Sequence, residues 1–131
     1  MSREPLSVFV TTLDNAATLE RCLASVAFAD EIVVLDSGSS DATHEIAMRH
    51  GARWFVEPFA GYGPQKLSAM RKTTHRWVLL LDADECVPDA CRAAIERALE
   101  APAVAGFTIP RREQLFWRLQ HEHARHNPML R

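Results

Sequence analysis

Short apolar runs alternate along the chain with segments whose apolar residues recur every three or four positions. The runs are rich in β-branched and aromatic residues, which predicts strands, and the longer period predicts helices. Asn15 and Asp41 can cap the first two helices, and Gly51 suits a helix end. Pro64 and Pro88 suit the first turns of the next two helices. The predicted strands, with helices between them, are Leu6–Thr12, Glu31–Leu35, Ala52–Val56, Arg76–Leu81 and Val104–Ile109.

This alternation predicts a three-layer α/β/α fold with a mostly parallel, Rossmann-like sheet. Arg76–Leu81 is the most apolar predicted strand, so we expect it at the centre of the sheet. Ligands of such sheets bind beyond the carboxyl ends of the strands. Acidic and hydroxyl side chains gather at these points, namely Thr11, Thr12 and Asp14 at the first strand, Asp36, Ser37 and Ser39 at the second, and Asp82, Asp84 and Glu85 at the fourth.

The segment Asp82-Ala83-Asp84 places two carboxylates one residue apart, directly after a buried strand. Such a pair can converge on one divalent cation, and Mg²⁺ and Mn²⁺ prefer oxygen ligands. A metal held by one or two protein carboxylates usually takes phosphate oxygens as further ligands. The pair therefore indicates a diphosphate-bearing ligand, although an acidic turn before a helix has the same composition.

Two other segments carry candidate ligand contacts. Asp36 ends the second predicted strand, where its carboxylate can accept a hydrogen bond from a base or a ribose. The residues after it, with Asp41 as a helix cap, are equally typical of an ordinary turn. The loop Gly61–Lys66 delivers Lys66 to a helix start, where a lysine can meet a phosphate. Its glycine spacing is neither that of a Walker loop nor that of a dinucleotide-binding fingerprint.

The composition is that of one soluble globular domain: 131 residues, 47% hydrophobic and 24% charged, with a net charge of −2. The near-neutral balance argues against nucleic-acid binding, and we expect no transmembrane segment because no apolar run is long enough. Three cysteines at irregular positions do not indicate a disulfide framework, so we expect a cytoplasmic protein. The sequence does not predict an oligomeric state.

Charge is unevenly distributed along the chain. Residues 1–110 contain 10 Lys and Arg against 15 Asp and Glu, whereas residues 111–131 contain 5 Arg against 2 Glu. We expect a ligand-binding domain at 1–110 and a basic tail at 111–131. The tail's Arg and aromatic residues suit peripheral contact with the inner face of the cytoplasmic membrane or docking to another segment. Its His121, His123 and His126 lack the spacing of a zinc site.

Five stretches together resemble the family-2 glycosyltransferases, whose nucleotide-sugar-binding domain has the GT-A fold. Within that family the chain looks most like bacterial lipopolysaccharide-core glucosyltransferases, over about residues 6–109. Each stretch is weak evidence alone, but five in the family's order are specific. The stretches are Leu6–Thr12, Glu20–Val26, Ala29–Ser39, Gly61–Lys66 and Leu81–Glu85.

The resemblance implies an inverting, metal-dependent transfer of a sugar from a nucleotide-diphosphate donor, most often UDP-linked. The implied acceptor is a glycan or a lipid-linked molecule in lipopolysaccharide or cell-envelope polysaccharide synthesis. Asp84 and Asp82 would hold Mg²⁺ or Mn²⁺, with Asp82 also near the ribose or diphosphate. Thr11 would line the nucleotide pocket, Asp36 would bind the base, and Lys66 would lie near the nucleotide or its diphosphate. The metal would offset charge on the departing diphosphate, and a carboxylate base would deprotonate the acceptor hydroxyl.

That catalytic base is not identified. The family's acceptor half lies well beyond the metal motif, and 47 residues follow Asp84 here. We therefore expect the chain to be the front part of a larger enzyme, with residues 111–131 as the start of an incomplete acceptor-side segment. Asn127 stands where relatives tend to carry an Asp, and Leu13 stands at an aromatic or Lys position. Three available carboxylates, none of them selected by the sequence, are Asp89, Glu113 and Glu122.

Two other interpretations stay open. One is a non-catalytic fragment that binds a nucleotide sugar or serves as an interaction module. The other is a phosphatase of the haloacid-dehalogenase kind, whose D-x-D motif also follows an apolar strand and supplies an Asp nucleophile. The phosphatase motif requires Thr or Val where this chain has Cys86. It also lies near the start of phosphatase chains, whereas D-A-D follows the fourth predicted strand here. The pattern therefore favours the glycosyltransferase.

Overall fold

The structure is a computed structural model that describes residues 3–111, 113–115 and 118–120. The chain divides into two compact units, Met1–Ala101 and Pro102–Arg131. The second unit contains an antiparallel hairpin of β5 (Glu113–Leu115) and β6 (Arg118–Gln120). The first unit consists, in chain order, of β1 (Leu6–Thr12), α1 (Ala16–Ala24), β2 (Glu31–Asp36), α2 (Thr43–Arg49), β3 (Arg53–Val56), α3 (Tyr62–Arg71), β4 (Trp77–Asp82) and α4 (Asp89–Ala98).

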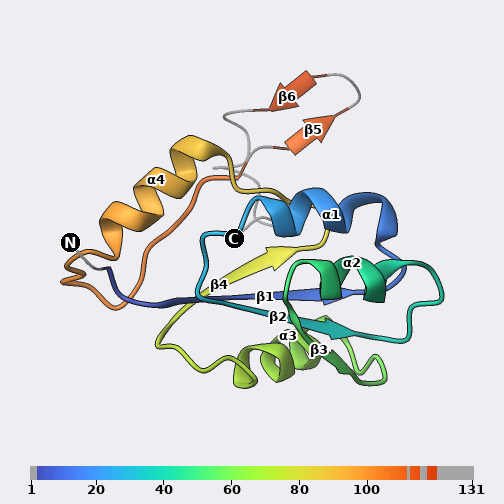
Figure 1. Ribbon diagram of the computed structural model, residues 1–131. Helices are drawn as coiled ribbons and strands as arrows, with labels where there is room; N and C mark the ends of the chain where they lie inside the picture. The colour runs from blue at the N-terminus through green and yellow to red at the C-terminus, as the bar shows by residue number, and fades with distance from the viewer. Residues whose placement is uncertain (1–2, 112, 116–117, 121–131) are drawn as a thin grey trace. The chain divides into compact units, whose positions relative to one another are not determined.

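The four strands of the first unit form one sheet in the order β3-β2-β1-β4, with every neighbouring pair parallel. Helices α1, α2 and α4 cover one face of the sheet, and α3 covers the other (Figure 1). The predicted three-layer α/β/α fold with a parallel sheet is therefore confirmed. Because the four strands run the same way, their carboxyl ends meet on one side of the sheet. This side is the carboxyl edge, which is distinct from the edge strands β3 and β4.

Two apolar clusters hold the layers together, one on each face of the sheet. Successive residues of β1 point to opposite faces, so Val8 and Val10 join the larger cluster with Leu23 of α1. Phe9, between them, joins the smaller cluster with Ala69 of α3. Full burial of a Val, Leu or Phe side chain contributes about 1.5–3 kcal/mol. These contacts fix both helical layers against the strands that lead to the site.

Two of the predicted strand features are wrong. The strand expected at the centre of the sheet is the edge strand β4, which pairs with β1 alone and leaves Leu80 41% exposed. The apolar composition of β4 did not place it at the centre: its faces are only partly covered, with Leu81 as its one buried residue, and the order of the strands decides which of its edges is paired. Residues 104–109 form no strand, because strand propensity is a weak preference that the surrounding structure overrides.

The predicted helix boundaries are only partly matched by their expected caps. Helix α2 ends as predicted: Gly51 has a φ of 71° and its N–H donates to the carbonyl of Met48 at 3.1 Å. Asn15 precedes α1 but does not cap it through its side chain. Its Oδ1 instead accepts from the N–H of Leu13 at 2.8 Å, which tightens the turn after β1.

A partly buried carboxylate on the opposite side of the sheet joins the amino ends of the strands. Glu31, at the start of β2, accepts hydrogen bonds from Ser7 Oγ, Arg53 Nη1, and the backbone N–H and hydroxyl of Thr74, at 2.8–2.9 Å. Burial acts to raise the pKa of Glu31, but the hydrogen bonds from Thr74, Ser7 and Arg53 outweigh it and lower that pKa to about 2. The hydrogen bonds of Glu31 thus hold the amino ends of the strands together.

Candidate functional site

The register of the sheet sets the positions of the first candidate residues. Thr11 pairs with Asp82 across the β1–β4 ladder, and Thr12 pairs with Asp36 across the β1–β2 ladder. Side chains from three strands that are far apart in the chain are therefore neighbours at the carboxyl edge. This convergence follows from parallel pairing and does not depend on any ligand.

A cavity of about 510 Å³ opens at this edge, entirely within the first unit. It combines residues from the ends of β1, β2 and β4 with residues around the start of α3. The lining residues are Thr11, Thr12, Leu13, Asn15, Ser37, Phe59, Tyr62, Gln65, Lys66, Asp82, Ala83 and Asp84. Four of the five predicted site residues, all except Asp36, therefore line one cavity.

The Asp82–Glu85 turn presents two carboxylates to this cavity. The N–H of Glu85 donates to the Asp82 carbonyl at 2.9 Å, and the N–H of Asp82 donates to Glu85 Oε1 at 2.8 Å. All three residues of the Asp82-Ala83-Asp84 segment line the cavity, and Ala83 between the two carboxylates is buried. Lys66 Nζ lies 3.3 Å from Asp82 Oδ1, so a cation already stands beside the first carboxylate.

Two oxygen donors that face one water-accessible cavity fit a hard divalent cation such as Mg²⁺ or Mn²⁺. Within the part of the chain that the structure describes, no three His, Cys, Asp or Glu side chains are grouped closely enough to hold a metal ion. Asp82 and Asp84 would therefore supply a minority of the ligands. Water and the oxygens of a bound phosphate would complete the shell, which is the usual situation for Mg²⁺ beside a phosphate ligand.

Asp36 differs from the other predicted site residues because its carboxylate is already fully bonded. Its side chain is 1% exposed, and it does not line the cavity. Oδ1 accepts from the hydroxyls of Thr12 and Ser39, and Oδ2 accepts from the N–H groups of Gly38 and Ser39, at 2.5–2.9 Å. Four donors match the roughly four acceptor sites of a carboxylate.

The pKa of Asp36 reflects this arrangement. Burial is the largest influence and acts to raise the pKa, but the hydrogen bonds from Ser39, Thr12 and Gly38 together hold it below its ordinary value. The carboxylate is charged and shapes the loop after β2. The residue that this loop presents to the cavity is the next one, Ser37.

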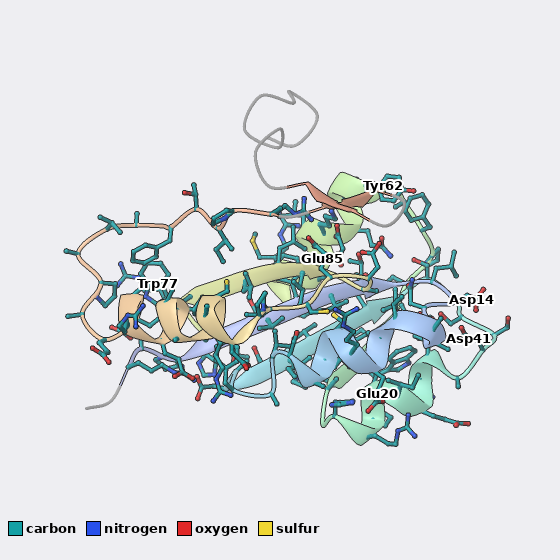
Figure 2. The ribbon with its side chains drawn as sticks, turned by 90° about the horizontal axis from the view of Figure 1, so that it is seen from above. Asp14, Glu20, Asp41, Tyr62, Trp77 and Glu85 are labelled. Atoms are coloured by element: carbon teal, nitrogen blue, oxygen red, sulfur yellow. The ribbon has the colours of Figure 1, made fainter. Side chains whose placement is uncertain are left out.

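Two further acids bind the loops after β1 and β2 to each other. Asp14 Oδ1 accepts from the N–H of Ser40 at 2.7 Å, and the N–H of Asp14 donates to Ser39 Oγ at 2.7 Å. Asp41 accepts from the N–H of Thr43 at 2.9 Å and from the N–H of Ala16, in α1, at 3.0 Å. Figure 2 shows Asp14 and Asp41 together at this end of the molecule. Several of the acidic residues at the carboxyl edge therefore hold the loops in place.

Sequence reasoning missed three cavity residues around the start of α3. Gln65 is 9% exposed, and its Nε2 donates to Ser37 Oγ, which links α3 to the loop after β2. Phe59 and Tyr62 are 52% and 76% exposed. One signal was available: Tyr62 and Lys66 are four residues apart, so a helix starting at Tyr62 puts both on one face.

The family model of glycosyl transferase family 2 matches residues 7–131, nearly the whole chain. The chain belongs to glycosyl transferase family 2. The predicted resemblance is thereby confirmed, and the match favours the glycosyltransferase interpretation over the phosphatase.

Relatives with recorded names point the same way. The chain is 33% identical over 117 residues to the lipopolysaccharide core biosynthesis glycosyltransferase LpsC of Rhizobium meliloti, a match that covers 85% of this chain and 43% of LpsC. It is 43% identical over 81 residues to an uncharacterized glycosyltransferase of Rickettsia bellii, covering 61% of this chain and 28% of that protein. The chain thus spans less than half the length of these family-2 relatives.

Solved structures share the fold. Glucosyl-3-phosphoglycerate synthase of Mycobacterium tuberculosis, in complex with Mn²⁺, UDP and glucosyl-3-phosphoglycerate, superposes with a TM-score of 0.54 at 29% identity, over 61% of this chain and 33% of the synthase. The same synthase with Mg²⁺ and UDP gives a TM-score of 0.56 at 30% identity, over 65% and 35% of the two chains. TarS of S. aureus gives 0.59 at 23% identity, over 72% and 32%, which shows the fold alone.

Other family-2 predictions are not tested by the described residues. Asp89, one of the available bases, is exposed in the first turn of α4 and does not line the cavity. Glu122, Asn127 and the histidines of the tail lie outside the described residues. The roles predicted for 1–110 and 111–131, including membrane contact, stay predictions. None of the described helices is both long and apolar enough to cross a membrane.

Proposed function

We propose that this chain is the donor-binding part of an inverting, metal-dependent family-2 glycosyltransferase that uses a UDP-sugar. The observation that carries the proposal is the convergence of Asp82, Asp84 and Lys66 on one cavity at the carboxyl edge of a parallel sheet. Structural neighbours hold UDP with Mn²⁺ or Mg²⁺, which supports the same donor chemistry here. The relative LpsC supports a glycan or lipid-linked acceptor in lipopolysaccharide core synthesis.

In the proposed reaction, an acceptor oxygen forms a bond to the anomeric carbon of the donor sugar while the bond from that carbon to the diphosphate breaks. The configuration at the carbon inverts, the diphosphate leaves with the electron pair, and a base takes the hydroxyl proton. A bound divalent cation would supply Lewis-acid stabilisation of the leaving diphosphate. Asp82 and Asp84 would hold this cation, and Lys66 would offset the remaining negative charge.

The chain's other residues would position this machinery. Thr11 pairs with Asp82 and would line the nucleotide pocket beside it. Asp36 is expected from the family resemblance to bind the base. Its four internal hydrogen bonds support a different contribution, in which it holds the loop that presents Ser37.

Calorimetric titration with UDP in the presence of Mn²⁺ tests the proposal. Wild type should bind UDP only with the metal, and Asp84→Ala should lose that binding. Asp89→Ala is the matched control, because Asp89 is an exposed aspartate of the same unit that does not line the cavity. Equal binding of UDP in EDTA, or unchanged binding in Asp84→Ala, would refute the donor site.

A non-catalytic nucleotide-sugar-binding module is the alternative that one observation favours. The carboxylates that line the cavity, within the described residues, are Asp82 and Asp84, and both are assigned to the cation. A separate acceptor base is not among them. Release of free sugar from a UDP-sugar, followed for wild type and Asp84→Ala, separates the two: metal-dependent turnover supports the enzyme, and binding without turnover supports the module.

A further inference from the structure

Two exposed aromatic rings stand at the rim of the cavity. Phe59 and Tyr62 are 52% and 76% exposed, and both line the cavity whose other wall carries Asp82 and Asp84. The rings meet edge to face, with centroids 5.1 Å apart and planes at 73°. Aromatic side chains usually bury their faces in a folded protein. A paired set left open beside a polar cavity is therefore suited to contact a flat or apolar part of a ligand.

The backbone around the two rings is fixed on both sides. The N–H of Glu57 donates to the carbonyl of Asp36 at 3.0 Å, which holds the chain as it leaves β3. Gly61 has a φ of 103°, a conformation that favours glycine, and its carbonyl accepts from the N–H of Gln65 at 3.0 Å to begin α3. Figure 2 shows the Tyr62 ring projecting from the start of α3. The rings are thus carried on an anchored turn.

The order of the strands gives the cavity a direction. Asp82 and Asp84 follow β4, at one edge of the sheet, whereas Phe59 follows β3, at the other edge. Between them lie the ends of β1 and β2, and neighbouring strands are about 4.8 Å apart. Lys66 lies four residues after Tyr62, about 6 Å along α3, and reaches Asp82. The cavity therefore runs from a charged end at β4 to an aromatic end at the loop after β3.

We propose that Phe59 and Tyr62 form the surface on which the base of the nucleotide stacks. This inference rests on the proposed function, since it takes the diphosphate to lie at Asp82, Asp84 and Lys66. A nucleotide whose phosphates occupy the β4 end can keep the rest of its length in the cavity only by extending past Thr11 and Ser37 toward the rings. Leu13, which also lines the cavity, is apolar but has no aromatic face.

Stacking of a base on an aromatic side chain is sequence-tolerant, because every base has a π-face. The rings would therefore contribute affinity for nucleotides in general, while polar contacts would choose among bases. We expect loss of one ring to weaken UDP binding about tenfold, in the lower part of the range that alanine substitution gives for stacked bases.

Tyr62 is the single tyrosine of the chain, so 3-fluorotyrosine labels this one position. We expect the fluorine resonance of the labelled protein to shift on addition of UDP with Mn²⁺. Inorganic pyrophosphate with Mn²⁺, which lacks a base, should bind and leave the resonance in place. An equal shift with pyrophosphate, or a shift that needs the sugar of a UDP-sugar, would overturn the assignment of the rings to the base.

Variants complete the test. Tyr62→Leu and Phe59→Leu remove an aromatic face and keep an apolar side chain, and each should weaken UDP binding about tenfold while leaving pyrophosphate binding unchanged. Tyr62→Phe should bind UDP like wild type. Leu67→Ala is the control, an exposed α3 residue outside the cavity lining.

The two proposals fail differently. If UDP binds with Mn²⁺ but Tyr62→Leu and Phe59→Leu bind it normally, the stacking surface is refuted and the donor site stands. If wild type binds no UDP at all, the donor site is refuted and the stacking surface falls with it.

Discussion

Lys66 Nζ lies 3.3 Å from Oδ1 of Asp82, although the two residues belong to different elements, α3 and the end of β4. Both side chains are about one third exposed, so the pair adds little to stability. Its value lies in its position, because it places a cation beside the carboxylates that would hold a metal–diphosphate complex.

Lys66→Ala should therefore weaken binding of UDP and Mn²⁺ about tenfold, since a hydrogen bond to a charged group contributes about 1.5–3 kcal/mol. The chain's other lysine, Lys72, pairs with Glu57 at 3.0 Å and does not line the cavity. Lys72→Ala is thus the matched control and should change affinity less than about twofold. Calorimetry measures the affinity of both variants for UDP with Mn²⁺. Equal losses of affinity would mean that the net charge of the protein, and not a contact made by Lys66, causes the effect.

The four hydrogen bonds of Asp36 lead to a prediction about stability. Asp36→Asn turns an NH₂ group toward donors that need an acceptor, so we expect the free energy of unfolding to fall by about 3 kcal/mol. The same substitution at the exposed Asp84 should change it by less than about 0.5 kcal/mol. Urea denaturation measures both. If the Asp36→Asn variant is as stable as wild type and loses only UDP binding, Asp36 contacts the nucleotide directly.

Glu85 is expected to act through Asp82. It accepts the Asp82 N–H at 2.8 Å and so closes the turn that aims both carboxylates. Glu85→Ala should lower Mn²⁺ affinity in the presence of UDP about tenfold, as loss of a group that orients metal ligands typically does. Glu85→Gln keeps an oxygen at the same place and should retain most of the affinity. Equal loss in both variants would mean that the charge of Glu85, and not its hydrogen bond, is what matters.

The acid limit of stability should depend on Glu31. Its pKa is lowered to about 2 in the folded protein, from an ordinary value of 4.5. The stabilisation is therefore fully present above pH 4.5, and it is lost as the pH falls from 4.5 toward 2. A shift of this size corresponds to about 3 kcal/mol. Glu31→Gln should flatten this part of the pH profile of unfolding, and an unchanged slope in that window would exclude the mechanism.

The sequence was sufficient for the three layers and the parallel sheet because these depend on patterns of apolar residues. Leu6–Thr12 is a β-branched and aromatic run and Ile32–Leu35 is a continuous apolar run, and both lie in buried parallel strands. The edge position of β4 could not be predicted in the same way, since an apolar composition settles neither how far the faces of a strand are covered nor which of its edges are paired. Val104–Ile109 has the composition of a strand but forms none, because strand propensity is overridden by the surrounding structure.

For the site, spacing along the chain located Asp82, Asp84, Thr11 and Lys66 in one cavity. It could not distinguish acids that line the cavity from acids that hold loops in place, because both are the same residue type, aspartate. Asp36, Asp14 and Asp41 are distinguished only by their hydrogen bonds. The position of Gln65 in the cavity depends on the hydrogen bond of its amide to Ser37, and no local sequence motif predicts that contact.

The central claim is that one cavity binds a divalent cation and a nucleotide diphosphate together through Asp82 and Asp84. Electron paramagnetic resonance of Mn²⁺ tests this most directly, because it counts free Mn²⁺ in the presence and absence of UDP. UDP should tighten Mn²⁺ binding to the protein, and Mn²⁺ should tighten UDP binding by the same factor, as linkage requires. Asp84→Ala should abolish both effects. Mn²⁺ affinity that is independent of UDP, or coupling that survives in Asp84→Ala, would contradict the claim.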